Sequence, residues 1–209
     1  MAIKFLYFDM GNVLLSFSHE RMCRQMAEVA GVTPAVVWEA LFEGPRAASV
    51  LWRFERGDLN ALAVYEHFCE WCGVRPDREA MFAAGCDMFA EIAASVKLVE
   101  CLHAAGRRLG ILSNTNPIDW GFVRAGRFPF LNRCFEHAVL SYEARSMKPE
   151  PAIYDHAVTR AGVAANEVFF TDDREENVAG AIAAGIDAVL FTSAAELAQE
   201  LRLRGVLGD

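Results

Sequence analysis

Short apolar runs alternate with longer amphipathic stretches along most of the chain. Five of these runs are rich in branched and aromatic residues, and several are apolar at every position. Such runs are typical of parallel strands that are covered by helices on both faces. We predict strands at residues 3–9, 108–113, 138–141, 168–171 and 186–191.

The stretches between these strands have helical periodicity. We predict helices at residues 96–105, 152–161, 175–184 and 194–204, with Ser95 and Ser193 as N-caps and with Gly162 and Gly185 after helix ends. Alternating strands and helices imply right-handed crossovers. The predicted fold class is therefore α/β, with a doubly wound parallel sheet.

One long segment interrupts this alternation. Between about Ser18 and Ala94 there is no convincing strand, only helical runs at residues 19–30, 34–42, 62–72 and 77–92. We predict a core made of residues 1–16 and 95–209, and a helical cap made of residues 17–94 and inserted after the first strand. That position in the chain would hang the cap over the loop that follows the first strand.

Composition narrows the functional classes. The 209 residues are 54% apolar, and the formal charge of −8 leaves no basic patch for nucleic acid. We expect no membrane association, because no stretch is long and apolar enough to span a bilayer, and the N-terminus does not resemble a signal peptide. Six scattered cysteines favour a reduced cytoplasmic location, and the Cys69–Cys72 pair is interpreted as ordinary packing.

Carboxylates follow two of the predicted strands. Asp9 ends the first apolar run, and Asp172 and Asp173 end the run that begins at Val168. Ligands bind at the carboxyl ends of strands in open α/β sheets, so three carboxylates there indicate a hard-cation site beside a nucleophile. Taken singly, Asp9 could instead cap its turn, and the acid pair could cap the next helix.

Two further motifs offer the hydrogen-bond donors and the positive charge that an anionic substrate requires. Ser113 and Asn114 close the second strand, where a hydroxyl and backbone N–H groups can cradle a phosphoryl group. The same residues could equally form an N-cap and turn. Lys148 lies in a loop with Pro149 and Pro151, and there it could neutralise charge on a transferred group, although a lone loop lysine is normally only solvated.

In this chain order the motifs resemble the haloacid dehalogenase-like (HAD) hydrolase superfamily. They are Asp9-Met10-Gly11-Asn12-Val13, Leu112-Ser113-Asn114-Thr115-Asn116, Met147-Lys148-Pro149-Glu150 and Phe170-Thr171-Asp172-Asp173. The first motif is similar to that of a bacterial subgroup with Asp-x-Gly-Asn-Val, which includes an α-D-glucose-1-phosphate phosphatase. The resemblance implies a Rossmann-like core, dependence on Mg²⁺ and hydrolysis of phosphomonoesters through an aspartyl-phosphate.

The resemblance also implies roles for individual residues. Asp9 would be the nucleophile, and Asp9, Asp173 and the Gly11 carbonyl would ligate Mg²⁺, with Asp172 acting directly or through water. Ser113 and Asn114 would hold the phosphoryl oxygens. Lys148 would pair with both the phosphoryl group and Asp9.

The chain departs from that pattern at Gly11. Most phosphatases of the superfamily carry an aspartate there, which protonates the leaving oxygen, and such help contributes ~10²–10⁴-fold to the rate. We therefore expect slow turnover of alkyl phosphates, a substrate with a better leaving group, or a substitute donor from the predicted cap. The candidates are Glu43, Arg46, Arg53, Glu55 and Arg56, although solvation or ion pairing within the cap would also explain each of them.

The predicted function is Mg²⁺-dependent hydrolysis of a small phosphorylated metabolite, possibly a sugar phosphate. Two alternatives remain open. One is hydrolytic dehalogenation of a 2-haloacid, in which the acid pair would have no purpose; the other is a catalytically weak binding or regulatory protein. Trp38, Trp52 and Trp71 in the predicted cap could supply an oligomer interface.

Overall fold

A five-stranded parallel sheet forms the centre of the protein, whose computed structural model describes residues 2–208. The strands lie in the order β5-β4-β1-β6-β7. Their bounds are β1 Phe5–Phe8, β4 Leu109–Ser113, β5 His137–Leu140, β6 Val168–Asp172 and β7 Asp187–Leu190. Each lies within or beside a predicted strand, and the predicted α/β fold is confirmed.

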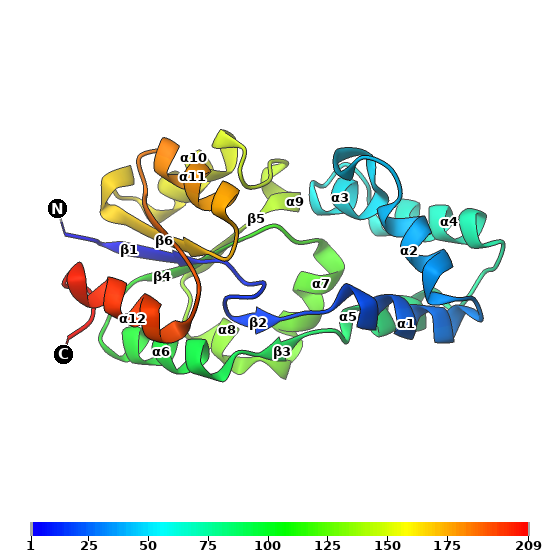
Figure 1. Ribbon diagram of the computed structural model, residues 1–209, viewed down its shortest axis with the longest axis horizontal. Coiled ribbons are helices and arrows are strands. Elements are labelled where there is room, and N and C mark those ends of the chain that lie inside the picture. Colours follow the sequence, from blue (N-terminus) through cyan, green and yellow to red (C-terminus); the bar gives the residue numbers. More distant parts are fainter. Residues whose placement is uncertain (1, 209) are drawn as a thin grey trace.

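Helices cover both faces of this sheet (Figure 1). Phe5 and Tyr7 of β1 pack in one cluster with α10 (Pro151–Ala161) and α11 (Glu175–Ala183). Leu6 and Phe8 pack in the other, with α6 (Ala93–Ala104) and α12 (Ala194–Leu203). Alternate β1 side chains thus enter opposite layers, which explains why the run is apolar at every position.

The second set of helices lies to one side of the sheet and packs largely on itself (Figure 1). It comprises α1 His19–Ala30, α2 Pro34–Phe42, η1 Arg46–Ala48, α3 Val50–Glu55, α4 Ala61–Cys72 and α5 Arg78–Cys86. Ser18 and Thr33 cap α1 and α2 by accepting N-terminal N–H groups, and Gly31 ends α1 in the left-handed region. We refer to α1–α5 as the cap helices; the predicted boundaries at residues 17 and 94 stay a prediction.

A two-residue ribbon was not predicted. β2 (Leu15–Ser16) pairs antiparallel with β3 (Ala90–Glu91), so the prediction of helix up to residue 92 is wrong: α5 ends at Cys86. Two residues give no alternating pattern in a sequence, and tertiary pairing alone creates this ribbon. The Ile92 N–H then donates to the Leu14 carbonyl at 3.0 Å, and α6 begins two residues earlier than the predicted Ser95 cap.

Further short helices lie between the strands of the core. They are α7 Pro117–Phe122, η2 Val123–Arg127, α8 Pro129–Arg133, α9 Ser141–Ala144 and η3 Ala165–Glu167. Among them α7 contacts α5, and α9 contacts α3. These two contacts place residues from distant parts of the chain beside the carboxyl ends of the strands.

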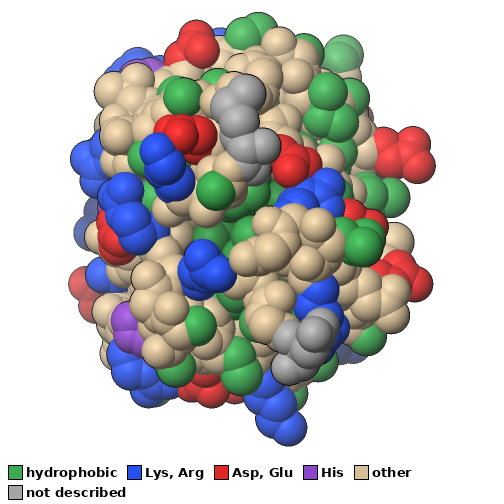
Figure 2. Space-filling model, turned by 90° about the vertical axis from the view of Figure 1, so that its left-hand side faces the viewer, with side chains coloured by type: hydrophobic (Ala, Val, Ile, Leu, Met, Phe, Trp, Pro, Cys, Tyr) green, Lys and Arg blue, Asp and Glu red, His purple; other side chains and the backbone are tan. Residues whose placement is uncertain are grey.

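The end of the core farthest from the cap helices has a mixed surface. Acidic and basic side chains are interspersed there with apolar ones, as Figure 2 shows. Within residues 2–208, none of the helices has both the length and the apolar character that a membrane crossing needs.

Candidate active site

The sheet order determines where the predicted site residues meet. β1 pairs with β4 on one side and with β6 on the other, all in parallel. The direction in which the chain adds strands therefore reverses at β1, and such a switch point opens a crevice beyond the carboxyl ends. Asp9 follows β1, Ser113 ends β4 and Asp172 ends β6, so the sheet brings the predicted residues to one edge.

Asp9 is held by its neighbours through one oxygen. Its Oδ1 accepts the Met10 N–H at 2.7 Å and lies 2.8 Å from Lys148 Nζ. Within residues 2–208, no hydrogen bond reaches its other oxygen, Oδ2. Burial raises the pKa of the Asp9 carboxyl, the Lys148 ammonium opposes this, and the charges of Asp172 and Asp173 reinforce it.

Lys148 is not a solvated loop lysine. Its side chain is only 1% exposed, and its Nζ contacts three acceptors: the Leu112 carbonyl at 2.8 Å, Asp172 Oδ2 at 2.6 Å and Asp9 Oδ1 at 2.8 Å. Burial by itself lowers the pKa of this ammonium, but Asp9 and Asp172 outweigh it and the net pKa is raised. Lys148 therefore stays charged and fixes both carboxylates.

The two adjacent acids, Asp172 and Asp173, differ in burial and in hydrogen bonds. Asp172 is fully buried, and besides Lys148 it accepts the Arg174 N–H and the Asn177 side chain, each at 2.9 Å. Asp173 is only partly buried and accepts Asn12 Nδ2 at 3.0 Å. Asp172 thus organises the loop before α11, as a turn-forming acid does, while Asp173 keeps an oxygen toward the crevice.

The three carboxylates suit a divalent cation. One oxygen from each of Asp9, Asp172 and Asp173 lies within 4.8 Å of the others. A single ammonium cannot balance three buried or half-buried carboxylates, and oxygen ligands are those that Mg²⁺ prefers. The donor set therefore fits a hard cation, although its identity does not follow from the geometry.

Gly11 provides a backbone carbonyl and nothing else. A Cβ at this position would lie 2.9 Å from Phe17 Cε1, so the Phe17 ring occupies the space that a longer side chain would take. Phe17 in turn packs against His19 and Phe89. An aromatic ring from the segment before α1 fills this side of the crevice.

Ser113 and Asn114 differ in their surroundings. Ser113 is buried, and its hydroxyl has one long contact, 3.4 Å to the Asn114 carbonyl. The Asn114 side chain donates to the Lys148 carbonyl at 3.0 Å and accepts the Lys148 N–H at 2.9 Å. Its amide positions the Lys148 loop, so only its backbone N–H remains for a phosphoryl oxygen. Asn116 caps α7, the alternative that the sequence left open for this cluster.

A cavity of about 360 Å³ lies between this edge of the sheet and the cap helices. Asp9, Ser113, Lys148 and Asp173 line it from the core, and Arg46 and Glu55 line it from the cap helices. The remaining predicted donors, Glu43, Arg53 and Arg56, do not line it. Sequence reasoning missed Asp119 and Arg174 in its wall; proximity to the Asn114 and Asp173 motifs is the only signal that could have found them.

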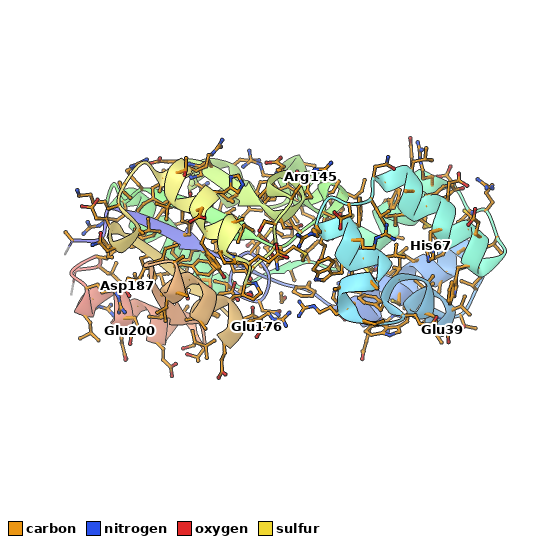
Figure 3. The ribbon with its side chains drawn as sticks, turned by 90° about the horizontal axis from the view of Figure 1, so that it is seen from above. Glu39, His67, Arg145, Glu176, Asp187 and Glu200 are labelled. Carbon is orange, nitrogen blue, oxygen red and sulfur yellow. The ribbon has the colours of Figure 1, made fainter. Side chains whose placement is uncertain are left out.

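Contacts between cap and core carry Glu55 into the cavity. The Ser141 hydroxyl of α9 donates to the Glu55 carbonyl at 2.6 Å and also accepts the Thr115 N–H at 2.9 Å. Arg56 forms a salt bridge with Glu150, next to the Lys148 loop. Arg46 Nη1 lies 3.9 Å from Glu176, which Figure 3 places on the side of the core toward the cap helices.

The environment of Glu55 disfavours its negative charge. Burial raises the pKa of this carboxyl from 4.5 to about 8, Asp119 and Asp9 reinforce the rise, and Arg46 and Arg174 only partly offset it. Burial likewise raises the pKa of Asp119, to about 6. Burial in this cavity therefore favours the protonated form of the Glu55 carboxyl.

Comparison with known proteins agrees with this architecture. Residues 3–185 match the haloacid dehalogenase-like hydrolase family. A D-ribitol-5-phosphate phosphatase of Bacteroides thetaiotaomicron is 24% identical over 184 residues, which cover 84% of this chain and 85% of that protein.

Solved structures are similar over nearly the whole chain. A HAD family enzyme from Bacteroides thetaiotaomicron, in complex with magnesium and inorganic phosphate, has a TM-score of 0.78 and 27% identity, covering 90% of this chain and 94% of its own. A predicted HAD-like hydrolase from Porphyromonas gingivalis has a TM-score of 0.80 and 22% identity, covering 97% and 99%. L-2-haloacid dehalogenase from Xanthobacter autotrophicus has a TM-score of 0.61 and 21% identity, covering 98% and 86%.

At 22% and 21% identity, the last two similarities establish the fold alone. The family match spans most of the sequence, and the strand order and the carboxylates at the strand ends agree with it. The chain belongs to the haloacid dehalogenase-like hydrolase family.

Proposed function

We propose that this protein is a Mg²⁺-dependent phosphatase that hydrolyses a small phosphomonoester through an aspartyl-phosphate on Asp9. The proposal rests mainly on the different surroundings of the two carboxylate oxygens of Asp9. One carboxylate oxygen is fixed by Lys148 and Met10, whereas the other has no partner among residues 2–208, and Asp9 borders a cavity of substrate size. A carboxylate with one oxygen left free is available for attack at phosphorus.

The proposed reaction has two displacements. Asp9 Oδ2 forms a bond to phosphorus while the bond from phosphorus to the ester oxygen breaks, and the ester oxygen takes up a proton. Water then attacks phosphorus, the bond from phosphorus to Asp9 breaks, and inorganic phosphate and the Asp9 carboxylate are released. Both steps avoid direct attack by water on the ester.

Residues of the chain would stabilise the charge that develops. Lys148 holds Asp9 in place and supplies positive charge beside the transferred group. Ser113 and the backbone N–H of Asn114 would donate to the phosphoryl oxygens. Asp9, Asp173 and the Gly11 carbonyl would hold the Mg²⁺, with Asp172 behind them, and the bound cation would offset the negative charge of the phosphoryl group.

Two similarities support phosphate chemistry over the alternatives. The relatives at 24% and 27% identity are a D-ribitol-5-phosphate phosphatase and a HAD family enzyme in complex with magnesium and inorganic phosphate. Dehalogenation at carbon would still use Asp9 as its nucleophile, but it would leave Asp172 and Asp173 beside it without a purpose. A polyol or sugar phosphate is the substrate class that we propose, and the resemblance to an α-D-glucose-1-phosphate phosphatase stays a prediction.

The first test is hydrolysis of p-nitrophenyl phosphate. We expect turnover with Mg²⁺ and none with EDTA, and we expect Asp9→Asn to lower kcat by at least ~10³-fold because it removes the nucleophile. Asp155→Asn is the matched control, because Asp155 is exposed on α10. Circular dichroism should show the same fold in all three proteins.

Other outcomes separate the alternatives. Halide release from 2-chloropropionate that EDTA leaves unchanged would favour dehalogenation and contradict the proposed cation. Full activity in Asp9→Asn would remove Asp9 as the nucleophile. No turnover of any ester or haloacid would favour a binding or regulatory role.

A further inference from the structure

Departure of an alkoxide from phosphorus requires a proton, and position 11 cannot supply it. Gly11 has no side chain, and the Phe17 ring stands 2.9 Å from where its Cβ would be. If the protein is a phosphatase of alkyl esters, as proposed above, another group in the cavity must donate. The charged and titratable side chains that line the cavity can be considered in turn.

The core side chains are already committed, because Asp9 is the proposed nucleophile and Asp173 a proposed ligand of the cation. Lys148 directs its ammonium at three acceptors and must keep its charge to hold Asp9 and Asp172. Asp119 accepts Asn116 Nδ2 at 2.6 Å and the Cys86 thiol at 3.2 Å, and both bonds require it as an acceptor. Arg174 forms a salt bridge with Glu176 and is too basic to release a proton.

The cap side chains leave one candidate. Arg46 is again too basic, and burial lowers the pKa of His19, so its ring is neutral at pH 7 and is a poor acid. The Glu55 carboxyl lines the cavity, and within residues 2–208 no hydrogen bond or salt bridge reaches it. A half-buried carboxyl without a protein partner is free to bond to a ligand.

The backbone of Glu55 is fixed even though its side chain is free. Ser141 binds the Glu55 carbonyl and the Thr115 main chain together, so α3 is tied to the loop that carries Ser113 and Asn114. Gly57, two residues later, has φ +83°, and its Cα passes so close to Tyr142 that a Cβ would be 2.4 Å from the Tyr142 carbonyl oxygen. A donor must keep a constant position, and these contacts fix the backbone from which the Glu55 side chain extends to the cavity.

We propose that Glu55 is the catalytic acid and base of this enzyme, a role supplied by the cap helices in place of residue 11. In the first displacement, the proton leaves the Glu55 carboxyl and bonds to the ester oxygen as the bond to phosphorus breaks. In the second, the Glu55 carboxylate takes a proton from the water that attacks phosphorus. Alcohol and inorganic phosphate are released, and Glu55 and Asp9 return to their starting states.

The charges around Glu55 agree with this cycle. The groups that face it are Asp119 and Asp9, which favour the protonated form, and Arg46 and Arg174, which favour the carboxylate. With a pKa raised to about 8, the carboxyl carries its proton at the start of the cycle at pH 7. The nearby arginines make the carboxylate accessible after the proton has left.

The test compares Glu55→Gln with wild type on two esters in Mg²⁺. Glycerol 2-phosphate needs protonation of its leaving oxygen, whereas nitrophenolate is a stable anion. We expect kcat/KM for glycerol 2-phosphate to fall by ~10²–10⁴-fold and that for p-nitrophenyl phosphate to change by less than about threefold. Because water activation is also impaired, Glu55→Gln should release a burst of nitrophenol equal to the enzyme concentration, followed by slow steady turnover.

A control and a spectroscopic measurement accompany the kinetics. Glu43→Gln changes an exposed glutamate of the cap helices that does not line the cavity, and it should match wild type on both esters. Infrared difference spectra at pH 7 should contain a protonated carboxyl band in wild type that is missing from Glu55→Gln.

The results distinguish a failure of the role proposed for Glu55 from a failure of the proposed phosphatase activity. Equal losses on the two esters, or an unchanged kcat/KM for glycerol 2-phosphate, would overturn the role of Glu55 and leave the phosphatase intact. Absence of the carboxyl band would also overturn it. A wild-type protein that hydrolyses neither ester with Mg²⁺ would overturn the phosphatase and the proton donor together.

Discussion

Three acceptors around the Lys148 ammonium account for the geometry of Asp9, the proposed nucleophile. Each of the three N–H bonds has a partner, on Leu112, Asp172 or Asp9, and the Lys148 backbone is fixed by the Asn114 amide. A buried charge with complete pairing tolerates no substitution without consequences for its partners. At the scale of single residues, Lys148 is thus a structural group, in addition to the catalytic role proposed for it.

Lys148→Met should therefore affect stability and activity. Removing the ammonium leaves Asp9 and Asp172 uncompensated, and we expect a loss of about 3–5 kcal/mol in the free energy of unfolding, measured by urea titration in EDTA. We expect kcat with Mg²⁺ to fall by ~10²–10³-fold because charge on the transferred group is no longer neutralised. Lys97→Met, on an exposed position of α6, is the control, and equal stability of the two variants would contradict the network.

At the scale of elements, the decisive contact joins the end of α3 to α9. It consists of the hydrogen bond from Ser141 to the Glu55 carbonyl and the close passage of Gly57 over Tyr142. Beside it, Arg56 forms a salt bridge with Glu150, which precedes α10. Only glycine is compatible with that passage, because φ is positive and there is no room for a Cβ. The contact determines where the cavity wall of the cap helices stands.

Gly57→Ala and Gly44→Ala form a matched pair that isolates this contact. Both glycines have positive φ, +83° and +89°, but no atom lies within 4 Å of a Cβ at Gly44. Gly44→Ala should cost about 1–2 kcal/mol of stability through backbone strain alone, and Gly57→Ala should cost more, because its Cβ also meets the Tyr142 carbonyl oxygen. Only Gly57→Ala should displace Glu55, and it should lower kcat/KM for glycerol 2-phosphate several-fold more than that for p-nitrophenyl phosphate. Identical kinetics in the two variants would show that the α3–α9 contact does not set the position of the donor.

At the scale of the whole molecule, an acidic protein concentrates its unfavourable charges in one cavity. The net charge is −8, and Asp9, Glu55 and Asp119 all have raised pKa values inside it. Burial of carboxyl groups that titrate above their ordinary range makes stability depend on pH, since the unfolded chain ionises first. The cavity thus reduces stability at neutral pH, as functional sites commonly do.

The sign of this dependence can be tested at Glu55. Its folded pKa of about 8 exceeds the ordinary 4.5, so its contribution is fully present below pH 4.5 and is lost as the pH rises through 8. In EDTA, Glu55→Gln should equal wild type in stability at about pH 4.5 and should be the more stable protein at pH 8 and above. Urea unfolding across this range measures the difference, and a constant difference would mean that the Glu55 pKa is not raised.

An oligomer interface over the tryptophans of the cap helices stays a prediction. Trp38 and Trp71 on the cap helices are 45% and 46% exposed, whereas Trp52 is partly covered by Arg56. An interface over Trp38 and Trp71 would bury apolar surface that is now exposed to water.

Local sequence patterns determined the strands, several helix caps and the edge of the sheet at which the acids lie. The β1 run from Phe5 to Phe8 is apolar at every position because it is covered on both faces, and Thr33 and Ser193 cap helices through interactions a few residues long. Asp9 and Asp172 could be assigned to one edge of the sheet because parallel strands end on the same side. Those conclusions needed only periodicity and the chemistry of neighbouring residues.

Tertiary structure decided the rest, because the remaining contacts join residues that are far apart in sequence. The pairing of Leu15 with Glu91, the Phe17 ring beside Gly11 and the entry of Glu55 into the cavity leave no local pattern. Five charged residues before Gly57 were equal candidates in the sequence. The fold brings two of them, Arg46 and Glu55, to the cavity, and of these two only Glu55 is acidic enough to release a proton. The sequence gives the type of each side chain. Its pKa and its partners depend on the distant groups that the fold packs around it and that exclude water from it.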